Sequence, residues 1–185
     1  MADFDLRPAD GPIGAEITGL DVSRPLDASV FADSEAAFYR HSGVVIRDQT
    51  LSPAELAAFS RRFGTPQANV RAEIQKGAVP EITLISNITE NGKRVGSHDA
   101  GRYWHSDLCY LDKPSKMTLL HALEVPVRDG VAYGDTRFSG MAAAYDALPD
   151  DLRPRLDGLK AATGYRYMWI KMAHEFGVRP VLSDH

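Results

Sequence analysis

One short stretch near the middle of the chain combines side chains that could bind a metal ion. The sequence Trp104-His105-Ser106-Asp107 places an imidazole and a carboxylate two positions apart. On a strand, His105 and Asp107 would point to the same face. They would then supply two ligands of a 2-His-1-carboxylate triad, which leaves positions open at ferrous iron. The alternative is a surface histidine and aspartate that happen to alternate, because His-x-Asp alone is a weak motif.

The neighbours of this pair favour the metal interpretation. Trp104 and Tyr110 flank it, so the expected strand looks half buried. A carboxylate such as Asp107 is costly to bury unless it is paired or bound to a metal. Further along the chain, Thr136 follows a glycine and an aspartate, and its hydroxyl could donate to the far carboxylate of a co-substrate.

Three other reactive side chains have plainer interpretations. His121 lies in an apolar run and is interpreted as a core histidine with a satisfied ring. His98 lies in a loop and is interpreted as solvated, although it could line the mouth of a substrate site. Cys109 follows Asp107 by two positions on the expected strand and is interpreted as a small buried hydrophobe.

The elements that must position these residues are short strands with helices before and after them. The alternation of residue types predicts strands within 13–22 and over 44–46, 82–86, 104–111, 116–125 and 161–165. Helices are predicted over 28–41, 53–63, 141–148, 150–159 and 168–176. The regular strand–helix alternation of a doubly wound sheet is missing. An α+β fold with an antiparallel β core and external helices, one domain over residues 1–185, is therefore expected.

Local signals mark some of these boundaries. Ser52, Pro53 and Glu55 form a capping box with proline at the first helical position, which predicts a helix start. Ser42-Gly43 predicts the end of the preceding helix, and the apolar strand after it is expected to be buried on both faces. Residues 90–93 have the sequence of a hairpin turn, whereas residues 126–135 are expected to be a loop.

The composition excludes several classes of protein. The chain has 185 residues, the length of about one domain. Its net charge of −4 argues against a strongly basic nucleic-acid binder and a polybasic membrane clamp. The single cysteine excludes a disulfide framework and a cysteine-rich zinc site. No apolar run has the length of a signal peptide or a membrane span, so a soluble cytoplasmic protein is expected.

Several segments together resemble the taurine dioxygenase family, whose members are iron(II)- and 2-oxoglutarate-dependent oxygenases. Two of these segments are the possible iron motif at 104–107 and the Gly-Asp-Thr sequence at 134–136. The other matching segments lie at 14–21, 42–49, 56–64 and 143–149. The resemblance implies a double-stranded β-helix, or jelly roll, with flanking helices.

The resemblance also implies roles for particular residues. His105 and Asp107 would bind Fe(II), and Thr136 would bind the co-substrate 2-oxoglutarate. A substrate contact is expected from Asn87, which lies near the family's substrate-contacting position. Apart from the resemblance, Arg102 is expected to contact the substrate, because a guanidinium suits an anionic group, and Tyr110 is a further candidate. The implied reaction uses dioxygen, decarboxylates 2-oxoglutarate to succinate and hydroxylates a small, anionic organic substrate, such as a sulfonate or an aryloxyalkanoate.

The chain also departs from the pattern of the family. The family's second histidine ligand and its 2-oxoglutarate-binding arginine are expected beyond residue 185, so the chain resembles the N-terminal part of a longer, homo-oligomeric enzyme. Alone, these residues are expected to be inactive. Residues 130–134 replace the family's tighter Gly-Gly turn. The alternatives are a non-catalytic jelly-roll binding module and an inactive truncated product.

Overall fold

The described part of the chain contains two compact units. The computed structural model describes residues 3–67, 79–98, 101 and 104–164. The first unit is drawn from residues 1–102 and 119–147, and the second from residues 103–118 and 148–185. Helices and strands both occur, as expected for a mixed α and β protein. The grouping of all 185 residues into one domain stays a prediction.

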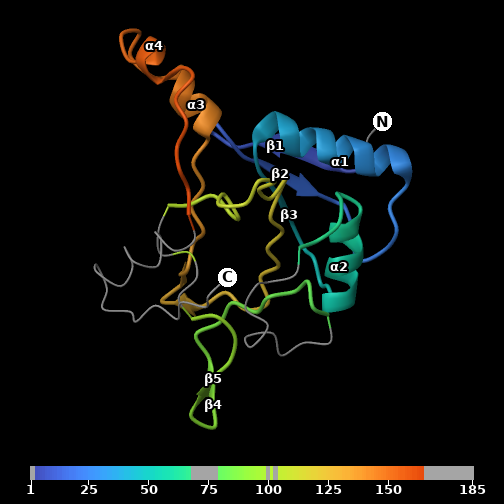
Figure 1. The fold of residues 1–185 in the computed structure, drawn as a ribbon. Coiled ribbons are helices and arrows are strands. Elements are labelled where there is room, and N and C mark those ends of the chain that lie inside the picture. The colour runs from blue at the N-terminus through green and yellow to red at the C-terminus, as the bar shows by residue number, and fades with distance from the viewer. Residues whose placement is uncertain (1–2, 68–78, 99–100, 102–103, 165–185) are drawn as a thin grey trace. The chain divides into compact units, whose positions relative to one another are not determined.

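The first unit is built on a three-stranded sheet in the order β1-β2-β3. Strands β1 (Asp5–Pro8) and β2 (Ala15–Thr18) are antiparallel, and β3 (Val44–Ile46) runs parallel to β2. Strand β2 lies within the segment that the sequence predicted, β3 matches its prediction, and β1 was not predicted. Helix α1 (Ala28–His41) connects β2 to β3 and lies along the sheet (Figure 1).

The core of this unit lies between the sheet and the helices. Ile17 of β2 is fully buried and belongs to a cluster with Val30 and Ala37 of α1 and with Phe59. Leu20, Val22 and Leu51 complete the buried cluster. Each large apolar side chain contributes about 1.5–3 kcal/mol when it leaves water, so this cluster is the main source of stability in the first unit.

The sequence places both ends of α1 correctly. Ser42 ends the helix in the left-handed conformation, with φ of 60°, and Arg40 and His41 lie in the last turn. The expectation that β3 is buried on both faces was wrong, because Val45 is 51% exposed. As the last strand of a three-stranded sheet, β3 is an edge strand, and its central side chain points away from the core.

The capping box begins α2 (Pro53–Arg61), as predicted. The Ser52 hydroxyl accepts the Glu55 N–H at 3.3 Å, and the Glu55 carboxylate accepts the Ser52 N–H at 2.7 Å. The Ser52 hydroxyl also donates to that carboxylate at 2.7 Å. These bonds, the backbone one first, lower the pKa of the Glu55 carboxyl. The four orphan N–H groups of a helix start explain why such a cap stabilises it.

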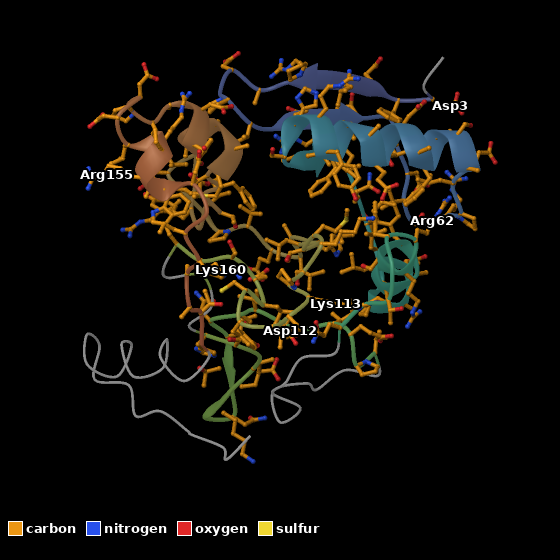
Figure 2. All side chains as sticks on the ribbon, turned by 45° about the horizontal axis from the view of Figure 1, so that its top comes forward. Asp3, Arg62, Asp112, Lys113, Arg155 and Lys160 are labelled. Atoms are coloured by element: carbon orange, nitrogen blue, oxygen red, sulfur yellow. The ribbon has the colours of Figure 1, made fainter. Side chains whose placement is uncertain are left out.

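An aromatic cluster joins α1 to the end of α2. Phe31 lies 4.8 Å from Phe63 and 6.4 Å from Phe59, measured between ring centroids. The Arg62 guanidinium stacks 4.1 Å from the Phe31 centroid and donates to the Leu26 carbonyl at 2.7 Å. Figure 2 labels Arg62 where the chain leaves α2. The cation–π contact and the hydrogen bond together fix the position of the two helices.

The Gln49 side chain connects the loop after β2 to the segment after β3. Its amide oxygen accepts the Val22 N–H at 3.0 Å, and its amide nitrogen donates to the Leu20 and Arg47 carbonyls at 2.6 Å each. Leu20 and Val22 are buried, so their backbone groups need a partner inside the protein. One side chain therefore supplies two of the hydrogen bonds that this loop requires, and a third to its own segment after β3.

Two short hairpins follow in the same unit. Strands β4 (Thr89–Glu90) and β5 (Lys93–Arg94) form the predicted hairpin, with Asn91 and Gly92 both at positive φ. Strands β6 (Val127–Arg128) and β7 (Val131–Ala132) form a second one around Asp129 and Gly130, again at positive φ. Residues 126–135 are therefore not the loop that was expected. Asp-Gly has the same preference for the type I′ turn as Asn-Gly.

Several predicted strands are not present in the described residues. Residues 104–111, 116–125 and 161–164 contain no strand, and the segment 82–86 forms only an isolated bridge between Ile85 and Ser97. A strand needs a hydrogen-bonded partner, which the local pattern of apolar residues cannot supply. Leu120, Leu123 and Val125 are accordingly exposed. The jelly roll stays a prediction.

The remaining helices are short. Helix α3 (Met141–Asp146) lies within its predicted range, and α4 (Arg153–Leu156) in the second unit is shorter than predicted. A break near Pro154 is expected from the sequence, but Pro154 lies in the first turn of α4, where its missing N–H costs nothing. The predicted helix 168–176 lies outside the described residues. Among those residues, no helix is long and apolar enough to cross a bilayer.

Replacing Ser52→Ala should lower the free energy of unfolding by about 1 kcal/mol, because it removes the α2 cap. Chemical denaturation followed by circular dichroism measures the change. Ser60→Ala is the matched control on the same helix, since the Ser60 hydroxyl only donates back to the Leu56 carbonyl. Equal effects of the two substitutions would contradict the role of the cap.

Replacing Gln49→Glu should lower the free energy of unfolding at pH 7 by about 1–3 kcal/mol, because a carboxylate cannot donate to the two carbonyls. The loss should shrink below pH of about 4.3, where the introduced carboxyl regains a proton. Burial against carbonyls raises its folded pKa, so stability is lost as the pH rises. Gln67→Glu at an exposed position is the control and should change stability by less than about 0.5 kcal/mol. A loss of unfolding free energy in Gln49→Glu that does not change with pH would contradict this explanation.

Candidate metal site

The stretch that carries His105 and Asp107 is an irregular segment followed by a turn, and not a strand. Residues 104–106 have no regular structure, and residues 107–110 form a turn that Leu111 closes by donating its N–H to the Leu108 carbonyl at 3.0 Å. Leu108 has φ of 54°, in the left-handed region. This conformation costs a leucine about 1–2 kcal/mol and interrupts an extended chain. Trp104 is 71% exposed, so the expectation of a half-buried strand was wrong here.

The two expected ligands nevertheless lie close together. His105 Nε2 lies 3.1 Å from Asp107 Oδ1, and both side chains are a little less than half exposed. Ligand atoms about 2.1 Å from a first-row metal ion and at right angles to each other lie about 3.0 Å apart. The separation and the types of the two donor atoms therefore fit adjacent ligands of one ion.

The second Asp107 oxygen has a partner of its own. The Thr118 hydroxyl donates to Asp107 Oδ2 at 2.5 Å, in the range of a charge-assisted hydrogen bond. Nothing in the sequence alone points to Thr118. Its only signal is a hydroxyl within the apolar run at 117–123, and that signal does not indicate which acidic residue it meets.

Cys109 in the same turn is exposed, so its expected burial was wrong. The left-handed Leu108 between Asp107 and Cys109 explains the difference, because the strand alternation that predicted a shared face is absent. The Thr163 hydroxyl donates to the Cys109 carbonyl at 2.6 Å and ties the turn to a distant part of the second unit.

The other predicted site residues lie in three places. Thr136 is exposed in the irregular segment between β7 and α3, and Asn87 is exposed just before β4, both in the first unit. Tyr110 is half-buried in the same turn as Asp107. Arg102 lies outside the described residues. Their roles stay predictions.

Two of the three other histidines in the described segments, His98 and His121, contact backbone carbonyls. His98 Nε2 lies 3.0 Å from the Ile88 carbonyl oxygen, so this nitrogen carries the proton and donates it. His121 is half-buried, with Nε2 3.4 Å from the Gln49 carbonyl oxygen. Over the part of the chain that the structure describes, no three His, Cys, Asp or Glu side chains gather into a complete metal site.

Comparison with known proteins places this geometry in context. The chain is 32% identical over 181 residues to the (S)-phenoxypropionate/alpha-ketoglutarate-dioxygenase of Sphingobium herbicidovorans, covering 93% of this chain and 57% of the relative. It is 37% identical over 161 residues to pentalenolactone F synthase of Streptomyces avermitilis, covering 83% and 50%. The chain thus spans about half the length of the curated relatives it matches.

A solved structure agrees with these relatives. The crystal structure of a taurine dioxygenase from Burkholderia xenovorans superposes with a TM-score of 0.63 and 27% identity, over 84% of this chain and 52% of that one. Almost the whole chain, residues 3–179, matches a single family. The chain therefore belongs to the taurine catabolism dioxygenase TauD, TfdA family.

Proposed function

We propose that the chain forms part of the catalytic domain of an Fe(II)- and 2-oxoglutarate-dependent dioxygenase with a jelly-roll core. The observation that carries the proposal is the 3.1 Å approach of His105 Nε2 to Asp107 Oδ1 within the region that matches the family. The likeness to the Burkholderia xenovorans taurine dioxygenase supports the fold. A binding module without catalysis would not need this pair of ligands.

In this proposal, His105 and Asp107 supply two of the three protein ligands of the iron. His105 would bind through a neutral imidazole nitrogen and Asp107 through an ionised carboxylate. When bound, the iron supplies the coordination of 2-oxoglutarate and dioxygen and the oxidising power for hydroxylation. Within the segments described, no third ligand joins the two residues. That the 185 residues alone are inactive stays a prediction.

The remaining residues of the chain would orient the small molecules. The Thr136 hydroxyl would donate to the distal carboxylate of 2-oxoglutarate. Arg102, Asn87 and Tyr110 would contact the substrate, and a guanidinium suits a carboxylate or sulfonate group. The relative from Sphingobium herbicidovorans is named for phenoxypropionate, which carries a carboxylate. The proposed substrate is therefore a small, anionic organic molecule. The intact enzyme is proposed to be a cytoplasmic homo-oligomer.

Replacing Asp107→Ala in the intact protein should abolish iron-dependent turnover of 2-oxoglutarate, because it removes the carboxylate ligand. Succinate formation measures the rate. Asp112→Ala, at an exposed carboxylate in the bend that follows the turn (Figure 2), should leave the rate within about twofold of the parent. A rate above about one tenth of the parent in Asp107→Ala would show that Asp107 is not the ligand.

Replacing Thr136→Val should weaken the binding of 2-oxoglutarate by about 1–3 kcal/mol, because the shape is kept and one hydroxyl is lost. Thr136→Ser, which keeps a hydroxyl, should bind within about threefold of the parent. Calorimetric titration of the metal-loaded protein measures both constants. An unchanged dissociation constant in Thr136→Val would move the anchor to another residue.

A further inference from the structure

We propose that Thr118 is a positioning residue that holds the Asp107 carboxylate so that one oxygen only faces the metal. The inference rests on the proposed function, in which Asp107 is a ligand. Its basis is the division of the two carboxylate oxygens: Oδ1 lies 3.1 Å from His105 Nε2, and Oδ2 accepts the Thr118 hydroxyl at 2.5 Å.

The hydroxyl restricts a torsion that is otherwise loose. The terminal torsion of an aspartate is broad and roughly two-fold, so a free carboxylate exchanges its oxygens readily. A charge-assisted bond to one oxygen fixes the plane of the carboxylate and identifies the other oxygen as the ligand atom. Thr118 comes from a segment eleven residues further along, so it constrains the turn from outside.

This constraint matters for the chemistry of the site. A carboxylate that binds through both oxygens occupies two coordination positions, whereas the facial triad depends on positions left open for 2-oxoglutarate and dioxygen. Residues that hydrogen-bond to metal ligands typically affect metal affinity by about 10–100-fold. Thr118 and Asp107 are both partly or fully exposed, where a hydrogen bond competes with water and adds little to folding. Loss of the Thr118–Asp107 hydrogen bond should therefore lower the metal affinity more than the stability of the fold.

The test is a titration of the metal-free intact protein with Co(II) alone, followed through the visible d–d absorption bands. Thr118→Val should weaken cobalt binding by about 10–100-fold and change the band pattern. Thr118→Ser should restore both the affinity and the spectrum. Thr163→Val is the matched control, because its hydroxyl donates to the Cys109 carbonyl in the same turn and not to a carboxylate. It should bind cobalt like the parent.

The outcomes separate the inference from the proposed function. If Asp107→Ala abolishes cobalt binding while Thr118→Val matches the parent in affinity and spectrum, the role of Thr118 is overturned and the metal site stands. The role is also overturned if Thr118→Ser fails to rescue, or if Thr163→Val weakens binding as much as Thr118→Val. If the parent binds no cobalt, or if Asp107→Ala binds it equally well, the proposed metal site itself fails and the inference fails with it.

Discussion

Because β2 and β3 run in the same direction, the chain between them must cross from one end of the sheet to the other, and α1 makes that crossing. The crossing places α1 on one face of the sheet and buries Ile17 completely beneath it. The apolar residues on either side of α1 then pack against one surface. The core, the aromatic cluster and the position of α2 therefore all depend on the parallel pairing of β2 and β3.

The same crossing leaves backbone groups after β2 that need hydrogen-bond partners. The chain leaves β2 through the buried residues Leu20 and Val22, where no neighbouring strand is available to pair with their backbone groups. Gln49 supplies the partners from the segment that follows β3. The Gln49 side chain thereby pairs backbone groups that the apolar core buries. This pairing matters because a buried backbone group without a partner costs more free energy than a hydrogen bond gains.

The candidate metal site depends on polar contacts rather than on apolar packing. The Asp107 carboxylate meets an imidazole at one oxygen and a hydroxyl at the other, and the left-handed Leu108 follows it in the turn. A nitrogen and an oxygen atom 3.1 Å apart fit two ligands of a metal ion as well as an ion pair. Membership of a dioxygenase family favours the metal site. Energy stored in a strained backbone is a common feature of functional sites.

The sequence by itself determined features that depend on residues a few positions apart. The end of α1 at Ser42, the capping box of α2, the turn at Asn91-Gly92 and the proximity of His105 to Asp107 are of this kind. For the histidine and aspartate the reason differed, because they lie close together in a segment that is not a strand. Only the tertiary structure decided which apolar segments found a partner strand, such as β3 beside β2, and which hydroxyl reaches the Asp107 carboxylate. These two contacts join segments eleven or more residues apart, and local pattern carries no information about which distant segments meet.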